Sequence, residues 1–209
     1  MSAISNRQRL GWQRSIKRAI DLFGSSVLLL LLSPVVALIA LLIKFYDGGP
    51  VIYRRRVVGL TGEFDAFKLR SMCVDADEIL RRTPAMRAEF EENFKLKSDP
   101  RITPVGRVIR KFSLDELPQL VNVLRGDMSL VGPRMITPAE LKRFDDVRWI
   151  FHSMKPGMTG YWQVYGRQEV SYAQRVEMEL FYVEHWSLLL DFKILLTTPL
   201  TVLRGAGAY

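Results

Sequence analysis

The sequence predicts an α+β fold that is predominantly helical, with a small β-hairpin and an N-terminal helix in the membrane. Three observations predict it. The run from Leu22 to Ile43 contains no ionisable side chain. Two segments of alternating apolar and basic residues, 51–58 and 63–72, are separated by a turn that glycines bound on both sides, which is typical of a hairpin. The rest of the chain carries several clear helix-start signals.

The composition is that of an ordinary globular protein with a basic excess. Of 209 residues, 48% are apolar and 25% are charged, and the net charge is +8, which excludes a disordered or collagen-like chain. The single cysteine, Cys73, excludes a fold built on internal disulfides. The two histidines, His152 and His185, form no pattern with zinc-site spacing.

The apolar run is compatible with two membrane topologies. Its length permits one crossing helix, since about 20 apolar residues span the hydrocarbon. However, Ser33 and Pro34 lie near its middle, and proline kinks a helix, so each half is only about 15–18 Å long. Basic residues flank both ends, among them Arg18 and Lys44, whereas a crossing helix keeps most of them on the cytoplasmic side. The residues alone leave a re-entrant helix-break-helix and a crossing helix equally open.

The chain after the hairpin is predicted to be mainly helical. A charged helical region runs from Asp75 to about Lys97 and is broken by Pro84. Gly126 is predicted to end a helix. Capping boxes, in which the first residue of a helix and a side chain three residues later bond each other's backbone, mark three further helix starts. They are Ser113 with Glu116, Thr137 with Glu140, and Ser171 with Gln174.

The C-terminal segment from Trp186 to Leu203 is strongly apolar but is interrupted by Asp191, Lys193 and Pro199. Charges at its centre make a second membrane crossing costly. We expect amphipathic, interfacial helices that lie on the bilayer or on the domain, with a core helix as the equal alternative.

An adjacent carboxylate pair, Asp115 and Glu116, follows a basic cluster at residues 107–111. The pair has a structural explanation, because the helix dipole favours acidic residues in a first turn. It also suits Mg²⁺-assisted phosphoryl transfer, in which one carboxylate holds the metal while the other attacks or accepts a proton. On these residues alone, the structural explanation stands first.

Two further stretches present arginines from glycine turns. The Gly132-Pro133 pair forms a rigid turn that can aim Arg134 at an anion. Residues 155–167 predict a turn, a short aromatic strand and a second glycine-presented arginine, Arg167, with Gln163 available to a nucleoside base. Ordinary loop structure and packing are the alternative explanations of both stretches.

Asp75 and Asp77 form the DxD pattern that binds the metal of nucleotide-sugar glycosyltransferases. The pair begins a helical, charge-rich stretch and has no apolar strand before it. A helix N-terminus is therefore the simpler explanation.

Taken in order along the chain, these motifs closely resemble the bacterial sugar transferases known as monotopic phosphoglycosyl transferases, in their minimal catalytic form. The resemblance covers about residues 17–203, and the stretch 113–134 is its most specific part. The matching stretches are Lys17-Arg18-x-x-Asp21, Ser33-Pro34 and residues 49–51, 67–72, 99–103, 113–134, 155–167 and 186–194.

The resemblance implies transfer of a sugar 1-phosphate from a nucleotide diphosphate sugar, usually a UDP-sugar, to undecaprenyl phosphate, with release of the nucleoside monophosphate. Asp115 is then the nucleophile that forms a covalent phosphosugar intermediate, and Glu116 helps to hold Mg²⁺ and to handle the proton. Phosphate-binding residues are then Arg110, Arg134, and Lys68 or Arg70. Gln163 and Arg167 are assigned to the nucleotide or sugar.

The resemblance also implies a re-entrant helix broken at Ser33-Pro34. Residues 1–48 then form the membrane segment, and residues 49–209 form a catalytic domain at the cytoplasmic face of the bacterial inner membrane, in contact with lipid. Basic residues cluster near the membrane run and the phosphate-like loops, so no nucleic-acid partner is expected. The oligomeric state is open, and a homodimer is compatible with the sequence.

Departures from the family pattern bear on the sugar. Met135 stands where proline is frequent, and Tyr165 stands where asparagine or serine is usual. Trp162, directly before Gln163, resembles a branch of the family that often transfers hexose 1-phosphates. The glycan, whether an exopolysaccharide, capsule, O-antigen or glycoprotein glycan, is not specified. Two other function classes stay open: a catalytically silent, membrane-attached basic module, and a glycosyltransferase that uses Asp75 and Asp77 and releases a nucleoside diphosphate.

Overall fold

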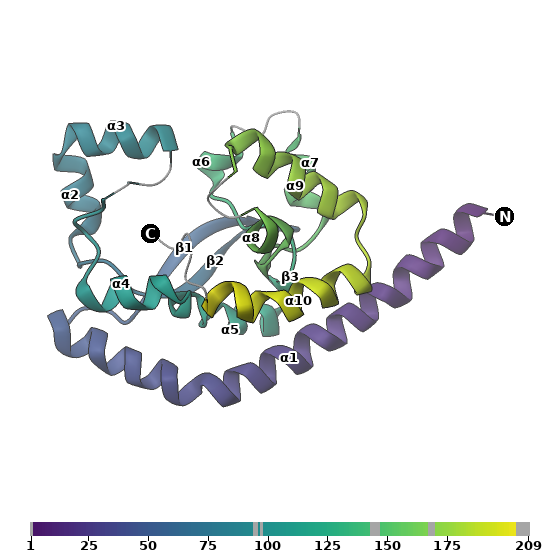
Figure 1. Ribbon diagram of the computed structural model, residues 1–209, viewed down its shortest axis with the longest axis horizontal. Coiled ribbons are helices and arrows are strands. Elements are labelled where there is room, and N and C mark those ends of the chain that lie inside the picture. Colours follow the sequence, from purple (N-terminus) through teal and green to yellow (C-terminus); the bar gives the residue numbers. More distant parts are fainter. Residues whose placement is uncertain (1, 94–95, 97, 143–146, 167–169, 204–209) are drawn as a thin grey trace.

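A computed structural model describes the chain except residues 1, 94–95, 97, 143–146, 167–169 and 204–209 (Figure 1). It is mostly helical with a small hairpin, as the sequence predicts, and it contains a second small sheet that was not predicted. The helices are α1 (Ser2–Asp47), α2 (Ala76–Arg82), α3 (Pro84–Asn93), α4 (Pro104–Lys111), the 3-10 helix η1 (Leu114–Glu116), α5 (Gln119–Arg125), α6 (Pro138–Leu141), α7 (Trp149–Ser153), α8 (Tyr161–Tyr165), α9 (Tyr172–Glu184) and α10 (Leu188–Leu203). The strands are β1 (Ile52–Gly59), β2 (Gly62–Leu69), β3 (Ser129–Val131) and β4 (Gly157–Thr159).

The predicted hairpin is confirmed. β1 and β2 pair antiparallel, with Gly59 opposite Gly62 across a two-residue turn. Gly62 has φ 135°, which a side chain rarely tolerates. β2 ends at Leu69, three residues before the predicted end, and Met72 instead forms an isolated bridge with Ile102.

A second, parallel sheet joins β3 to β4, with Ser129 opposite Gly157 and Val131 opposite Thr159. A Cβ at Gly157 would lie 2.1 Å from the backbone nitrogen of Gly132, so the two chains approach closely because this position is a glycine. The predicted aromatic strand over Tyr161–Tyr165 is wrong. Those residues form helix α8, which the bond from Val164 N–H to Gly160 O closes at 3.1 Å.

Two of the three predicted capping boxes are confirmed, at Thr137 with Glu140 and at Ser171 with Gln174. The prediction at Ser113 is wrong. Ser113 has φ 53°, in the left-handed region, and its side chain makes no capping bond. It forms the sharp turn between α4 and η1, a conformation that a residue other than glycine adopts at some cost.

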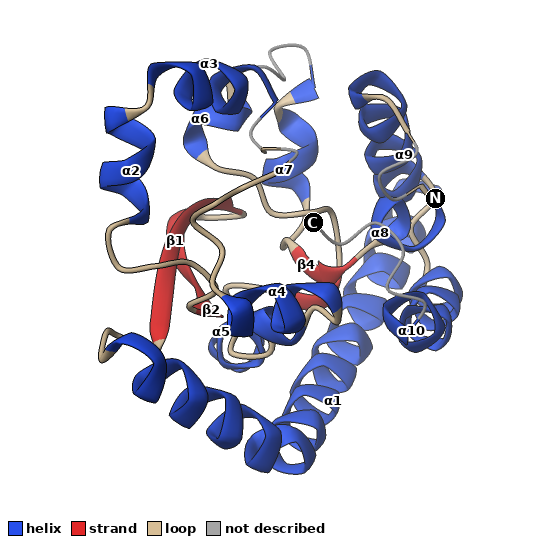
Figure 2. Cartoon of the chain, turned by 60° about the vertical axis from the view of Figure 1, so that its left-hand side comes forward, coloured by secondary structure: helices blue, strands red, loops and turns tan. Residues whose placement is uncertain are grey.

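Helix α1 is long, apolar and bent. Within the described chain, Gly11–Asp47 is the one stretch long and apolar enough to cross a membrane. Pro34 lies inside it, and Figure 2 shows that the helix changes direction along its length. The predicted helix-break-helix is therefore one bent helix, and its re-entrant placement stays a prediction.

The core forms where the hairpin meets the second sheet and the last helices. Val57, Ala66, Val123, Tyr182 and Ile194 are all buried there and contribute from β1, β2, α5, α9 and α10. Such burial stabilises each apolar side chain by roughly 1.5–3 kcal/mol. A smaller cluster packs the C-terminal half of α1 against β2 and α4; its buried members are Ile39, Ile43, Leu69 and Ile109.

Candidate active site

The carboxylate pair lies in the short helix η1, between α4 and α5. Asp115 is 7% exposed. The left-handed turn at Ser113 reverses the chain after α4 and so presents both acidic residues beside strand β2. The site is thus built by a turn, and not by the predicted capped helix.

Lys68 of β2 meets both carboxylates. Its Nζ donates to Glu116 Oε1 at 2.6 Å and lies 3.9 Å from Asp115 Oδ2. Its side chain is 13% exposed, so solvent screens this charge weakly. Of the two alternatives Lys68 and Arg70, the contacts place Lys68 at the pair.

Asn122, fully buried in α5, holds β2 in place behind this contact. Its amide oxygen accepts from Phe67 N–H at 3.0 Å, and its amide nitrogen donates to Asp65 O at 2.9 Å. These two bonds hold the strand on both sides of Ala66, and the bond at Phe67 lies one residue before Lys68. Asn122 belongs to the motif stretch, but its local sequence gave no sign of this role, because both partners lie on a distant strand.

The two acids differ in their electrostatics. Burial raises the pKa of Asp115, although Lys68 and Arg110 act to lower it. Burial also acts to raise the pKa of Glu116, but Lys68, Arg134 and the Lys68 hydrogen bond outweigh it, so that pKa is lowered. Neighbouring acids whose environments separate their pKa values are typical of acid–base and nucleophilic sites.

The predicted arginines occupy different places. Arg110, in the last turn of α4, opposes the rise in the pKa of Asp115, and Arg134 helps to lower the pKa of Glu116. Arg70 instead binds Asp47 at the end of α1, and its Nε donates to Pro50 O at 2.6 Å. It ties α1 to the hairpin, and its role toward phosphate stays a prediction.

Arg55 of β1 is one of the basic residues that follow the apolar run. Its charge also lowers the pKa of Glu116, and its guanidinium lies 3.8 Å from Glu140 Oε2. The strand alternation that puts it on this side of the hairpin was visible in the sequence, but the position of the carboxylate pair relative to that strand was not.

The aromatic segment contributes a ring between two arginines. The guanidinium carbons of Arg134 and Arg175 lie 5.3 and 4.7 Å from the centre of the Trp162 ring. Gln163 donates to Met158 O at 2.9 Å, which turns its amide nitrogen toward β4. Arg167 lies outside the described residues. The assignment of Gln163 and Arg167 to nucleotide or sugar stays a prediction.

The donor set can be compared with what Mg²⁺ needs. Among the described residues, no three His, Cys, Asp or Glu side chains gather into a metal cage. Mg²⁺ is commonly held by one or two carboxylates together with substrate phosphates and water. Asp115 and Glu116 supply two adjacent carboxylates beside cations that suit phosphate, so these residues fit that mode of binding.

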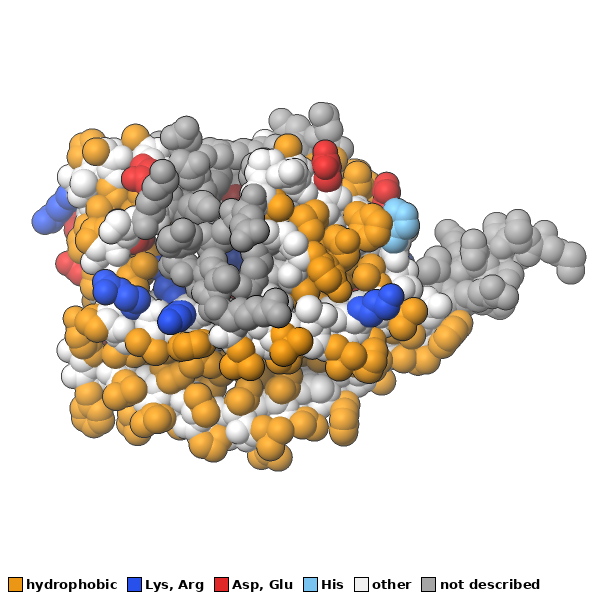
Figure 3. All heavy atoms as spheres, viewed as in Figure 1, with side chains coloured by type: hydrophobic (Ala, Val, Ile, Leu, Met, Phe, Trp, Pro, Cys, Tyr) orange, Lys and Arg blue, Asp and Glu red, His pale blue; other side chains and the backbone are white. Residues whose placement is uncertain are grey.

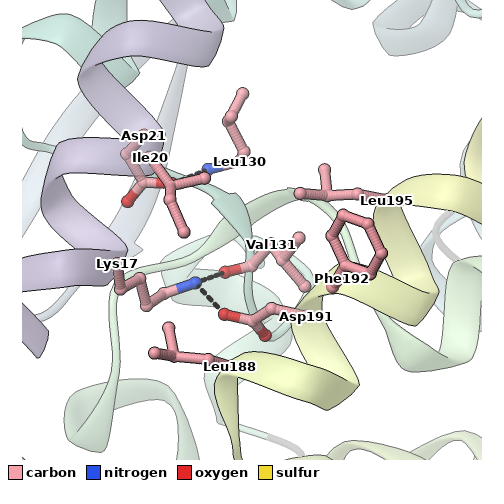
Figure 4. Close-up of a pocket in the computed structure, with 9 residues that line it drawn as sticks. All are labelled: Lys17, Ile20, Asp21, Leu130, Val131, Leu188, Asp191, Phe192 and Leu195. Atoms are coloured by element: carbon pink, nitrogen blue, oxygen red, sulfur yellow. Dashed lines mark hydrogen bonds and ion pairs between the residues drawn. The ribbon is translucent and has the colours of Figure 1, made fainter. Parts of the chain in front are cut away.

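A buried polar network fastens the N-terminal half of α1 to the domain (Figure 4). Lys17 Nζ donates to Asp191 Oδ2 of α10 at 2.6 Å and to Val131 O of β3 at 2.8 Å. Asp191 Oδ1 accepts from the Tyr182 hydroxyl at 2.7 Å. The charge that interrupts the apolar C-terminal segment therefore points inward, toward α1.

The opposite side of α10 is apolar and exposed. Its exposed large side chains recur every three or four residues, at Leu189, Phe192, Leu196, Leu200 and Leu203. On α1, Phe23, Leu30, Leu31 and Phe45 are between 67% and 83% exposed. Figure 3 shows hydrophobic side chains gathered along the edge where α1 lies. Exposed apolar surface of this extent is typical of contact with a membrane or a partner.

The DxD pair lies elsewhere. Asp75 precedes α2 and makes no side-chain capping bond, and Asp77 lies in the first turn of that helix. No described contact joins either residue to the Asp115–Glu116 pair. The helix N-terminus is therefore a sufficient explanation of this pattern.

Fold and site together combine a long, exposed apolar helix with a buried, cation-neutralised carboxylate pair, an arrangement that suits phosphoryl-transfer chemistry. Residues 12–205 match the family model of the bacterial sugar transferases. The chain belongs to that family, which confirms the resemblance stated from the motifs.

Curated relatives refine the comparison. The chain is 51% identical over 203 residues to the undecaprenyl-phosphate galactose phosphotransferase of Salmonella typhimurium, covering 94% of this chain and 42% of the relative. It is 48% identical to the UDP-galactose-lipid carrier transferase of Erwinia amylovora, covering 99% and 44%. It is 45% identical to the exopolysaccharide production protein ExoY of Rhizobium meliloti, covering 92% and 88%. The chain thus spans less than half of the first two relatives and most of the third.

Proposed function

We propose that the chain transfers a hexose 1-phosphate from a UDP-hexose to undecaprenyl phosphate at the cytoplasmic face of the bacterial inner membrane, and releases UMP. The observation that carries the proposal is the buried pair Asp115–Glu116, with Lys68 bonded to Glu116 at 2.6 Å. The names of two relatives, both of which specify galactose, support galactose as the hexose.

Asp115 is the proposed nucleophile. Its carboxylate oxygen attacks the phosphorus that bears the sugar, the bond from that phosphorus to the bridging oxygen breaks, and UMP leaves. A phosphate oxygen of undecaprenyl phosphate then attacks the same phosphorus and releases Asp115. Two displacements allow the soluble donor to leave before the lipid substrate reacts.

The cations around the pair make the attack of an anion on an anion feasible. Lys68, Arg110 and Arg134 act on the carboxylates, and the same charges can neutralise the donor phosphates. Glu116, ionised because its pKa is lowered, is the residue best suited to hold Mg²⁺. When bound, the metal ion would supply further neutralisation of the transferred phosphoryl group.

We further propose that α1 enters and leaves the same leaflet. Contacts at its two ends support this. Arg18, before the apolar run, donates to Val123 O and Leu124 O of α5, while Asp47, after the run, binds Arg70 beside the hairpin. A crossing helix would put these two ends on opposite sides of the membrane, and one domain could not bind both.

The activity is tested by UMP release in detergent micelles that contain undecaprenyl phosphate, over a panel of UDP-sugars with and without Mg²⁺. We expect Mg²⁺-dependent release with a UDP-hexose and loss of at least a hundredfold in Asp115→Asn. A silent binding module predicts no release with any donor, and a DxD glycosyltransferase predicts UDP in place of UMP.

The topology is tested separately. On a chain with Cys73→Ser, single cysteines replace Gly11, before the run, and Tyr46, after it. An impermeant thiol reagent applied to inside-out membrane vesicles should label both. Labelling of Tyr46→Cys with full protection of Gly11→Cys would restore the crossing helix.

A further inference from the structure

A buried carboxyl group in α9 takes no direct part in the proposed chemistry. Glu179 is 1% exposed. Its Oε1 accepts from the main-chain N–H of Arg134 at 3.0 Å, and its Oε2 has no hydrogen-bond partner among the described residues. Because a buried carboxyl with so few bonds costs stability relative to an apolar side chain, its presence at this position calls for a local role.

The carboxyl acts on the backbone of the arginine loop. Gly132 N–H donates to Thr159 O at 3.0 Å, and Pro133 O accepts from Gly157 N–H at 2.9 Å. Arg134 forms an isolated parallel bridge with Gly157, so β4 holds the loop up to Arg134. Glu179 supplies the next bond, at Arg134 itself. This bond therefore fixes the residue at which the side chain leaves the loop.

The side chain of Arg134 has two further constraints. Its guanidinium lies 5.3 Å from the centre of the Trp162 ring, and its charge lowers the pKa of Glu116. The Trp162 ring also makes a cation–π contact with Arg175, which lies one helical turn before Glu179 in α9. The Trp162 ring is shared by two cations, so its contact alone does not fix the Arg134 guanidinium. The backbone anchor adds to what sets the direction of this side chain.

We infer that Glu179 is a positioning residue for the transfer reaction: through the main-chain N–H of Arg134, it fixes the direction in which that arginine reaches the carboxylate pair and the donor phosphates. The inference rests on the proposed function. Glu179 is buried and does not touch substrate, so it is not a catalytic residue.

The protonated form of Glu179 can also make this bond. Burial raises the pKa of Glu179 to about 7, although the Arg134 N–H and the charges of Arg175 and Arg134 act to lower it. Burial and Asp191 raise the pKa of Tyr182, one turn further along α9, and the charge of Glu179 adds to this rise. A neutral glutamic acid still accepts from the Arg134 N–H, and glutamine has the same shape and the same acceptor oxygen. Glu179→Gln is therefore the conservative variant, and Glu179→Leu removes the acceptor.

The test is a double-mutant cycle on UMP release from the preferred UDP-hexose. We expect Glu179→Gln to keep at least a third of the wild-type kcat/KM and Glu179→Leu to lose at least tenfold. In an Arg134→Ala background, the leucine substitution should add less than a twofold loss, because the side chain that it misplaces is gone. Glu177→Leu, at an exposed position of the same helix, is the matched control and should lose less than twofold.

A second measurement does not depend on activity. Amide hydrogen exchange of the peptide that covers residues 130–136 should be faster in Glu179→Leu than in the wild type, Glu179→Gln and Glu177→Leu. Equal exchange in all four chains overturns the inference. So does an equal loss of kcat/KM from Glu179→Leu with and without Arg134, which indicates a general structural role while the proposed function stands. No UMP release by the wild type contradicts the proposed function and the inference with it.

Discussion

The contact between Lys17 and Asp191 makes a quantitative prediction about how α1 is held to the domain. Asp191→Leu removes the carboxylate that accepts from Lys17 Nζ at 2.6 Å and from the Tyr182 hydroxyl at 2.7 Å. The Lys17 and Asp191 side chains are only 14% and 8% exposed. The substitution therefore leaves a largely buried ammonium group with one hydrogen-bond partner, Val131 O, and with Asp21 as the remaining acidic neighbour.

Removing one partner of a buried ion pair costs about 3–5 kcal/mol. For a chain of this size, 1 kcal/mol lowers the unfolding temperature by about 2–4 °C, so Asp191→Leu should lower it by roughly 6–20 °C. The assay is thermal unfolding at a fixed detergent concentration. Lys193→Leu, at an exposed position of the same helix, is the matched control and should change the unfolding temperature by less than 2 °C, on the order expected of a surface substitution.

Lys17→Met combined with Asp191→Leu separates charge burial from other losses. Replacing a buried ion pair by apolar side chains is often close to neutral. The double variant should therefore recover at least half of the loss, although the Tyr182 hydroxyl and the Trp186 indole N–H still lack their acceptor. An unchanged unfolding temperature in Asp191→Leu, or a double variant less stable than the single one, would refute this account of the contact.

Three further predictions concern charge and membrane contact. The folded-state pKa of Glu179 is raised from 4.5 to about 7. Its contribution to the free energy of unfolding is therefore complete below about pH 4.5 and is lost as the pH rises through 7. Thermal unfolding measured against pH should show a loss of roughly 3 kcal/mol in the wild type and none of this loss in Glu179→Gln. Lys68→Met should raise the pKa values of the carboxylate pair and so move the acid limb of the kcat/KM pH profile to higher pH. It should also lower kcat about a hundredfold. An acid limb that does not move would contradict an electrostatic effect of Lys68 on the two carboxylates. Leu196→Glu in α10 should weaken binding to vesicles of bacterial lipid at least tenfold in a flotation assay, while Lys193→Leu should not; equal binding by both variants would contradict membrane contact by that helix.

The parts of the fold that could be predicted are those that local pattern determines. Alternating residues around a glycine-bounded turn give the hairpin, and side chains three residues apart give the starts at Thr137 and Ser171. The same capping pattern failed at Ser113 because it describes side-chain types, whereas the turn after α4 demands a left-handed backbone there. The parallel sheet was missed because each strand has three residues and its partner lies far away in the sequence.

The candidate site divides in the same way. The adjacent acids and Lys68 could be named from the motif, and the structure brings them together. Arg70, two residues after Lys68, could not be told apart from it, because its partner Asp47 lies at the end of another element. Glu179 gave no signal, since an acidic residue in the middle of α9 is ordinary until the burial of that face is known.

The most direct test of the central claim is a trapping experiment with donor alone. The wild-type chain is mixed with Mg²⁺ and a UDP-hexose, quenched in acid and analysed by mass spectrometry of the intact protein and of its peptides. We predict one hexose phosphate per chain, on Asp115, together with one equivalent of UMP, and no adduct in Asp115→Asn. UMP release that begins only after undecaprenyl phosphate is added, with no adduct at any time, would contradict the covalent mechanism.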